Sequence, residues 1–137
     1  MLGAAHAAAN PLTAHFGIVH GQAVGMMLPH VVRFNGADPE ALKAYAELAS
    51  APEIACVSHG FEKALEELIS HLNALLNIAG MPKSLGDCGV TRSMVPTLAG
   101  EAMKQWTATF NPRPVTRHDF EHLYEAAFAP RANGRIE

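Results

Sequence analysis

Near its amino terminus the chain reads Gly3-Ala4-Ala5-His6-Ala7-Ala8-Ala9-Asn10-Pro11-Leu12-Thr13-Ala14-His15-Phe16-Gly17-Ile18-Val19-His20-Gly21. Most residues of this run other than the histidines are alanine or glycine, whose small side chains allow a close approach of backbone and ligand. Imidazole is a common metal donor. We expect one helix carrying His6, a break at Pro11 and a second helix starting at His20, so that the two imidazole rings aim at one point.

Composition limits the classes of protein that this chain can represent. It has 137 residues, 49% of them hydrophobic and 17% charged, which indicates one globular domain. The net charge of -3 and the lack of a basic run argue against nucleic-acid and anionic-membrane partners. No apolar run reaches the roughly 18 residues of a membrane span, and the start lacks the features of a signal peptide. We therefore expect a cytoplasmic protein in which Cys56 and Cys88 are free thiols, with a disulfide between them as the minor alternative.

The hydrophobic pattern is helical throughout, and no segment alternates convincingly with a period of two. It predicts an all-α, multi-helix bundle that forms a single domain over residues 1–137. The expected helices run from about 2 to 14, from 20 to 33 with Pro29 kinking or dividing it, from 39 to near 51, from 61 to 79, from 92 to about 106 with an interruption near Pro96, and from 117 to near 128.

Capping signals set several of these boundaries. Asp38 is a good N-cap with Pro39 after it, and Thr116 with Asp119 resembles a capping box. Gly80 is a suitable C-cap glycine. His59 or Ser58 and Thr91 are further candidate caps. Residues 131–137 are expected to form a frayed tail.

Three segments carry a specific resemblance. They are the run from His6 to Asn35, then Met81-Pro82-Lys83-Ser84-Leu85 followed by Gly89-Val90, and Phe110-Asn111-Pro112-Arg113-Pro114-Val115-Thr116. The first resembles the second signature of the iron-containing alcohol dehydrogenases. The other two resemble that family's loop before its penultimate helix and its closing loop. The chain is therefore similar to this family over nearly its whole length.

The resemblance implies a C-terminal helical domain packed against an α/β domain that binds NAD or NADP. It also implies a metal, usually Fe(II) and sometimes Zn, held in the cleft by one Asp and three His. His6 matches the third ligand and His20 the fourth, while the other two would precede Met1. Asn10 stands where many members have a further His near the metal; Asn cannot titrate, so it can only hydrogen-bond. The implied substrate is a short alcohol or aldehyde.

The remaining candidate residues have weaker signals. His15 is interpreted as a pocket or surface residue and His30 as hydrogen-bonded packing, while His118 and His122 form an i,i+4 pair that could bind a metal adventitiously. The other histidines, His59 and His71, are read as surface or capping residues. Phe16, Trp106 and Phe110 are guesses at pocket lining. No dinucleotide-binding glycine motif follows a strand, so we expect no cofactor site here.

The resemblance predicts a chain truncated at its amino terminus, with Met1 inside a helix already underway and the nucleotide-binding domain absent. Three explanations stay open at this point. The chain is a fragment of a full dehydrogenase, one subunit of a split dehydrogenase, or a non-enzymatic helical remnant that self-associates. In each case we expect the lone chain to be inactive, and NAD(P) to bind only with the missing domain.

Overall fold

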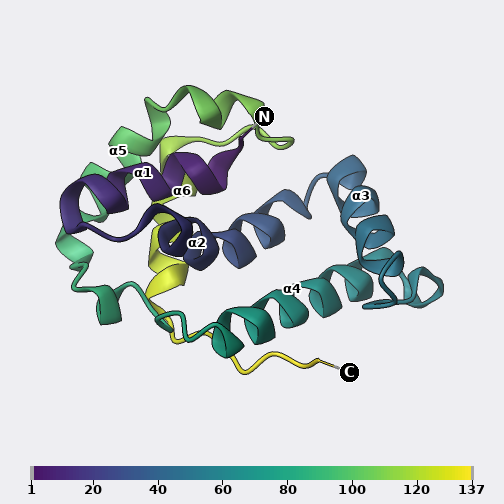
Figure 1. Cartoon of the computed structure of the whole chain (residues 1–137). Helices are drawn as coiled ribbons and strands as arrows, with labels where there is room; N and C mark the ends of the chain where they lie inside the picture. Colours follow the sequence, from purple (N-terminus) through teal and green to yellow (C-terminus); the bar gives the residue numbers. More distant parts are fainter. Residues whose placement is uncertain (1, 137) are drawn as a thin grey trace.

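The computed structural model describes residues 2–136 and contains helices but no β-strand within that range. Figure 1 shows their arrangement. The α-helices are α1 (Ala4–Phe16), α2 (His20–Asn35), α3 (Pro39–Ser50), α4 (Phe61–Ile78), α5 (Val95–Met103) and α6 (Arg117–Phe128). Short 3-10 turns are η1 (Val57–His59), η2 (Gly86–Cys88), η3 (Arg92–Met94) and η4 (Trp106–Phe110). The all-α fold predicted from the sequence is confirmed.

The first helix corrects the expected break at Pro11. Pro11 lies inside α1 and is fully buried, and the helix continues to Phe16. A proline within a helix removes one backbone hydrogen bond and crowds the preceding turn. Burial of Pro11 and the surrounding alanines offsets this cost. One residue along, the Tyr124 hydroxyl of α6 donates to the Ala8 carbonyl at 2.7 Å. Pro29 likewise does not divide α2.

The ends of α1 also differ from expectation. The helix begins at Ala4, so Leu2 and Gly3 are not helix interior, and the expectation placed on Met1 lies outside the described residues. Gly17 ends the helix in the left-handed conformation, with φ of 65°, and its N–H donates to the Thr13 carbonyl at 3.0 Å. Glycine adopts this conformation without a steric penalty. The true stop signal was therefore Gly17.

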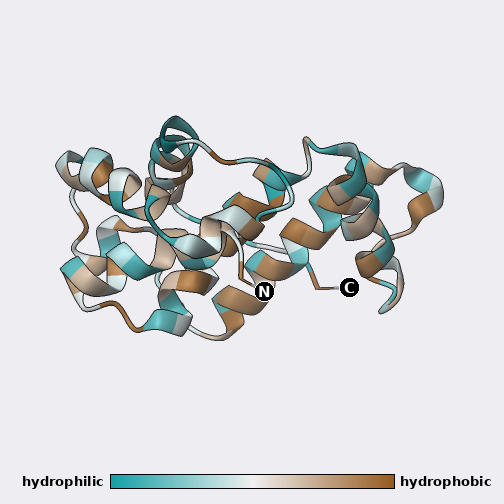
Figure 2. Cartoon of the chain, turned by 90° about the horizontal axis from the view of Figure 1, so that it is seen from above, coloured by the Kyte–Doolittle hydropathy of each residue, from teal (hydrophilic) through white to brown (hydrophobic). Residues whose placement is uncertain are grey.

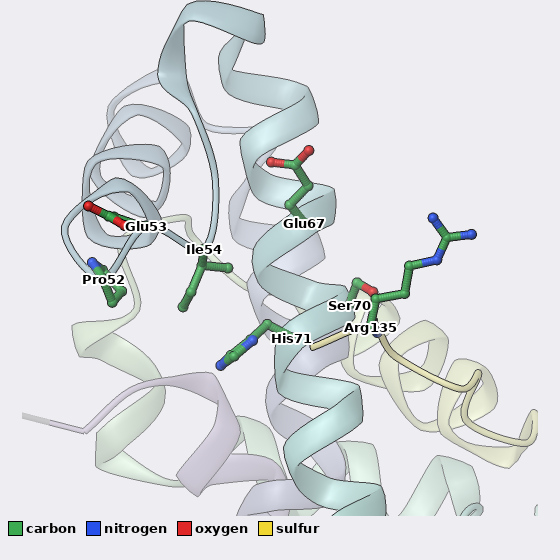
Figure 3. A pocket seen from close by; sticks show the side chains of 7 residues that line it. All are labelled: Pro52, Glu53, Ile54, Glu67, Ser70, His71 and Arg135. Atoms are coloured by element: carbon green, nitrogen blue, oxygen red, sulfur yellow. Dashed lines mark hydrogen bonds between the residues drawn. The ribbon is translucent and has the colours of Figure 1, made fainter. Parts of the chain in front are cut away.

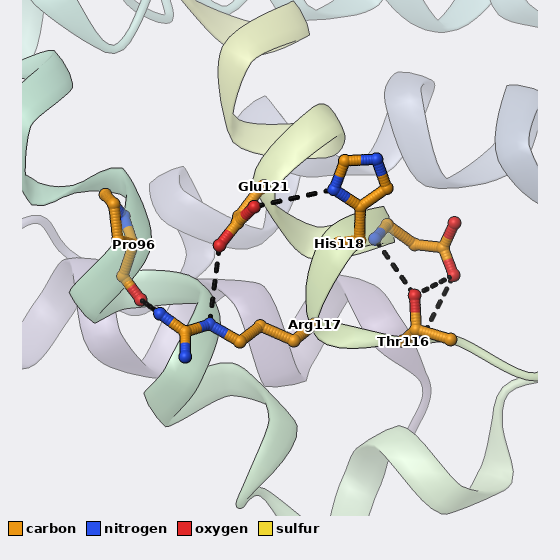
Figure 4. A network of polar contacts seen from close by, with 6 residues as sticks. Pro96, Thr116, Arg117, His118 and Glu121 are labelled. Carbon is orange, nitrogen blue, oxygen red and sulfur yellow. Dashed lines mark hydrogen bonds and ion pairs between the residues drawn. The ribbon is translucent and has the colours of Figure 1, made fainter.

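Two of the predicted N-caps are confirmed. The Asp38 carboxylate accepts from the Ala41 N–H at 2.9 Å, with Pro39 in the first turn of α3. At α6, Thr116 and Asp119 form a complete capping box, and Figure 4 shows the surrounding polar contacts at this helix start. Gly80, with φ of 69°, follows α4 as expected.

The other expected caps are wrong. Thr91 makes no side-chain cap bond, and α4 begins after Gly60 with no side-chain cap from Ser58 or His59. Pro96 lies in the first turn of α5 instead of interrupting a longer helix, because a first-turn proline lacks only an N–H that has no partner in the helix. That helix therefore starts at Val95 and ends at Met103.

Buried side chains form two clusters. The α1/α6 core joins α1, α2, α5 and α6, and its members are mostly alanines around a few large side chains such as Phe120 and Tyr124. The α3/α4 core is smaller and joins the end of α2 to α3 and α4 through residues such as Leu68 and Ile69. In Figure 2 many helices carry both brown and teal segments, as helices with one buried face do.

The segment after α6 is not frayed, which corrects the sequence expectation for 131–136. The Arg131 guanidinium donates to the carbonyls of Met81 and Pro82, each at 3.0 Å, and to the Asn77 side chain at 3.0 Å. Figure 1 shows this segment, in yellow, running beside α4. A Cβ at Gly134 would collide with the backbone of Ser70 and Ala74, so only glycine permits this close approach. Glu137 lies outside the described residues.

Candidate metal centre

The structure brings His6 and His20 together. Their ring centroids lie 5.3 Å apart with the ring planes inclined by 48°. His6 is in the first turns of α1 and His20 is the first residue of α2. The Gly17 turn reverses the chain within three residues, so the end of α1 leads directly into the start of α2. The two rings therefore lie close together, as predicted from the sequence, but the turn between their helices is at Gly17 and not at Pro11.

The two imidazoles have different surroundings. His6 is half-buried and His20 is exposed. Burial, together with the neighbouring His20 ring, lowers the pKa of His6 below its usual value, which favours the neutral form that can donate a lone pair to a metal. Within residues 2–136 no third His, Cys, Asp or Glu joins the pair to complete a metal-binding group. The described chain therefore supplies two donors and an open, solvent-facing side.

Asn10 lies one helical turn after His6. Its amide donates to the Gln105 side-chain oxygen at 2.9 Å, which fixes the end of the side chain against the segment that follows α5. Asn10 has no proton to transfer, so this position can only position or hydrogen-bond a ligand. No local pattern points to Gln105, because its role depends on a contact between residues 95 positions apart.

The other candidate residues have different contacts. His15 pairs with Glu101 of α5 at 2.9 Å and so joins two helices on the surface. Phe16 packs against the α1/α6 core. Trp106 and Phe110 form an edge-to-face pair at 5.6 Å, and Trp106 is 65% exposed. Between them Thr107 is buried with its hydroxyl unpartnered, a feature that sequence reasoning missed.

The two cysteines are free, as predicted, with Cys56 exposed and Cys88 partly buried. Hydrogen bonds from Ser58 lower the pKa of Cys56, whereas burial raises the pKa of Cys88. They lie on different elements and neither belongs to the His6 and His20 pair.

A separate cavity of about 200 Å³ lies beside α4 and contains neither His6 nor His20. Figure 3 shows its side chains, which come from the segment after α3, from α4 and from the carboxy-terminal segment. Glu53 and Arg135 stand at opposite sides of it and point away from each other. The cavity therefore offers no converging set of groups.

The sequence of the whole chain can be compared with known proteins. The model of the Fe-containing alcohol dehydrogenase family, C-terminal, matches residues 1–128. The chain belongs to the iron-containing alcohol dehydrogenase family. It corresponds to the helical C-terminal domain of that family, as the resemblance predicted.

Two curated relatives illustrate the match. Lactaldehyde reductase of Escherichia coli (strain K12) is 34% identical over 127 residues, covering 93% of this chain and 33% of the relative. 1,3-propanediol dehydrogenase of Klebsiella pneumoniae is 34% identical over 128 residues, covering 93% of this chain and 32% of the relative. The chain thus spans about a third of the length of these relatives.

Solved structures agree with this assignment. The crystal structure of 1,3-propanediol oxidoreductase matches with a TM-score of 0.81 at 32% identity, covering 93% of this chain and 33% of that one. Alcohol dehydrogenase from Oenococcus oeni matches with a TM-score of 0.80 at 27% identity, with the same coverage. No described helix of this family member is long and apolar enough to cross a membrane.

Proposed function

We propose that this chain is the metal-binding helical domain of an iron-dependent alcohol dehydrogenase, an NAD(P)-linked oxidoreductase of alcohols and aldehydes. The convergence of His6 and His20 at 5.3 Å carries the proposal. The proposed metal is Fe(II) or Zn, both of which accept imidazole ligands.

The imidazoles of His6 and His20 are chemically suited to bind Fe(II) or Zn. His6 and His20 each offer one ring nitrogen, and the exposure of His20 leaves room for further ligands and for substrate. An ion bound there would supply a Lewis acid for the substrate oxygen. Family membership supports the same assignment at the level of the family.

The protein residues of this domain have positioning roles in the proposal. The α1/α6 core holds the two helices that present the imidazoles, and the Gly17 turn sets their separation. Gln105 orients Asn10, which we propose hydrogen-bonds near the reacting oxygen without moving a proton. The proton of the alcohol must then leave by another route.

The test is a titration with Co(II), used as a probe of the metal site, followed by absorption and calorimetry. His118 and His122 lie 4.2 Å apart and form a second pair of imidazoles, so the experiment uses a His118→Ala background. We expect His6→Ala and His20→Ala each to weaken binding at least about tenfold, because each removes one of two ligands. His15→Ala is the matched control, since His15 also lies on α1 but pairs with Glu101.

Equal metal affinity in the parent, His6→Ala and His20→Ala chains would remove the ligand assignment. A second measurement concerns activity. We expect no NADH or NADPH oxidation with short aldehydes by these 137 residues alone, because residues 2–136 form no strand–glycine loop–helix unit for a dinucleotide. Turnover by the purified chain with added Fe(II) would contradict this part of the proposal.

A further inference from the structure

A groove of about 360 Å³ lies between the second half of α2 and α6. It contains neither His6 nor His20, and the proposed function uses none of its residues. The polar and aromatic side chains that line it are His30, Arg33 and Phe34 from α2, Arg113 from the loop before α6, and Asp119 and His122 from α6.

The Arg113 side chain is held in place by contacts with Phe34 of α2. Its guanidinium lies 3.9 Å from the centroid of the Phe34 ring, and one Nη1 N–H donates to the Phe34 carbonyl at 2.8 Å. The remaining guanidinium N–H groups make no hydrogen bond to any described residue. A stacked guanidinium with free N–H groups is a pre-oriented fork for an oxyanion.

Arg33 is oriented by an ion pair with α4. Its Nε and Nη2 donate to the Glu66 carboxylate of α4 at 3.3 and 2.6 Å, which leaves Nη1 without a bond to the described chain. Glu66 balances this charge but lies outside the groove lining. The ion pair therefore aligns the second guanidinium beside the groove.

The one carboxylate in the lining already has donors. The Asp119 carboxylate accepts from the Thr116 N–H at 2.8 Å and from the Thr116 hydroxyl at 2.7 Å, and Figure 4 shows Thr116 at this helix start. Burial alone would raise the pKa of Asp119, but these hydrogen bonds and the Arg113 charge outweigh it and hold the pKa below its usual value. Asp119 is thus ionised and engaged in capping.

His30 is the titratable group of the groove that has no acidic neighbour acting on it. Burial, with the positive charges of Arg33 and Arg131, lowers the pKa of His30 to about 4. No acidic group opposes this effect on His30. His122 lies across the groove on α6, with the ring of His118 4.2 Å beyond it. Two imidazoles and two arginine side chains therefore line the same groove.

We propose that this groove binds a small oxyanion of the phosphate or carboxylate class, held by the free N–H groups of Arg113 and Arg33 and by His30. Phe34 and Leu123 also line the groove. Apolar side chains beside these groups reduce competition from water and strengthen the charge-assisted hydrogen bonds. The site is independent of the metal and of the proposed redox reaction.

The test uses sulfate, which keeps its charge between pH 4 and 8, and follows the histidine ring signals by NMR. Sulfate is titrated at pH 7 and 4.5, with chloride at equal ionic strength as the control. We expect saturable shifts at His30 and His122. We also expect affinity to rise about tenfold at the lower pH, because an anion that raises the pKa of His30 must bind its charged form more tightly.

Variants separate the site from general charge. We expect Arg113→Gln and His122→Gln to weaken sulfate binding at least about fivefold, and His30→Gln to reduce its pH dependence. Arg92→Gln is the matched control: Arg92 also stacks on a phenylalanine, at 4.7 Å from the Phe128 centroid, but lies outside the groove. If Arg113→Gln fails to fold, His122→Gln on the surface of α6 decides the result.

A parallel titration with acetate at pH 7 identifies the class. Saturable binding of sulfate, of acetate or of both supports the site and assigns it to phosphate-type, carboxylate-type or general oxyanions. The proposal is overturned if neither anion gives saturable shifts at His30, or if Arg92→Gln weakens binding as much as the groove variants do.

Discussion

The two cores of the molecule differ in how completely they are packed. The α1/α6 core contains nearly all of the largest fully buried side chains, among them Tyr124, Phe120 and Leu12, whereas the α3/α4 core contributes only Ile69 to that group. Several apolar side chains of α3 and α4, such as Leu48 and Ile78, are exposed instead. The histidine pair lies on helices of the better packed core, which suits a site that needs fixed geometry.

The largest expected effect comes from removing a large side chain from each core. We expect Phe120→Ala to lower the free energy of unfolding by about 3–5 kcal/mol, and Ile69→Ala by about 2–3 kcal/mol, because the smaller core can relax into the space. Denaturant titration of both variants measures the difference. An equal or larger loss in Ile69→Ala would show that the two cores are equivalent.

The next effect is a pH dependence centred on α2, the helix that both cores share. The pKa of His30 is its usual 6.5 in the unfolded chain and about 4 in the folded chain. Between these pH values the unfolded chain therefore binds more protons than the folded chain. The free energy of unfolding therefore falls as pH drops from 6.5 toward 4, by up to about 3 kcal/mol.

The measurement is denaturant titration across this pH range in sulfate-free buffer. His30→Gln should flatten the curve, since glutamine does not titrate. A slope that is unchanged in His30→Gln would assign the pH dependence to other groups.

A smaller effect tests one contact inside the α1/α6 core. Tyr124→Phe removes the hydroxyl that donates to the Ala8 carbonyl at 2.7 Å, and should lower the free energy of unfolding by about 1–2 kcal/mol. Tyr45→Phe is the comparison, because the Tyr45 hydroxyl accepts from Asn35 at the edge of the α3/α4 core and is only partly buried. Thermal unfolding of both should give the larger loss for Tyr124→Phe.

The smallest effect compares the two confirmed caps. Asp38→Ala and Thr116→Ala should each cost about 1 kcal/mol. Amide hydrogen exchange should show faster opening of α3 alone in Asp38→Ala, since α3 belongs only to the α3/α4 core. Loss of protection across α6 and α1 in Asp38→Ala would contradict the separation of the two cores.

Local signals in the sequence predicted much of this fold. The caps at Asp38 and Thr116 and the glycine at 80 act over a few residues, so they could be read directly. The continuity of α1 through Pro11 could not be predicted, because it depends on burial against helices that are distant along the chain. The contacts of Arg131 with Asn77 and Pro82 could not be predicted either, because these residues are distant from it along the chain.

In the candidate site too, local sequence predicts some features and distant contacts decide the others. The closeness of His6 and His20 was predicted with a break at Pro11 that the structure does not contain, since the turn is at Gly17. The family resemblance gave this closeness a chemical meaning. The partner of Asn10, the pairing of His15 with Glu101 and the unpartnered hydroxyl of Thr107 depend on tertiary packing. A single sequence contains no direct record of such contacts.

The left-handed turn at Gly17 has a consequence for how the histidine pair assembles. The two imidazoles are 14 positions apart in sequence, and a three-residue corner brings their helices together. Closing so short a loop costs little chain entropy and is fast as an elementary step. Each ring therefore meets the other at a high effective concentration, and a cation captured by one donor finds the second without a search through the rest of the molecule.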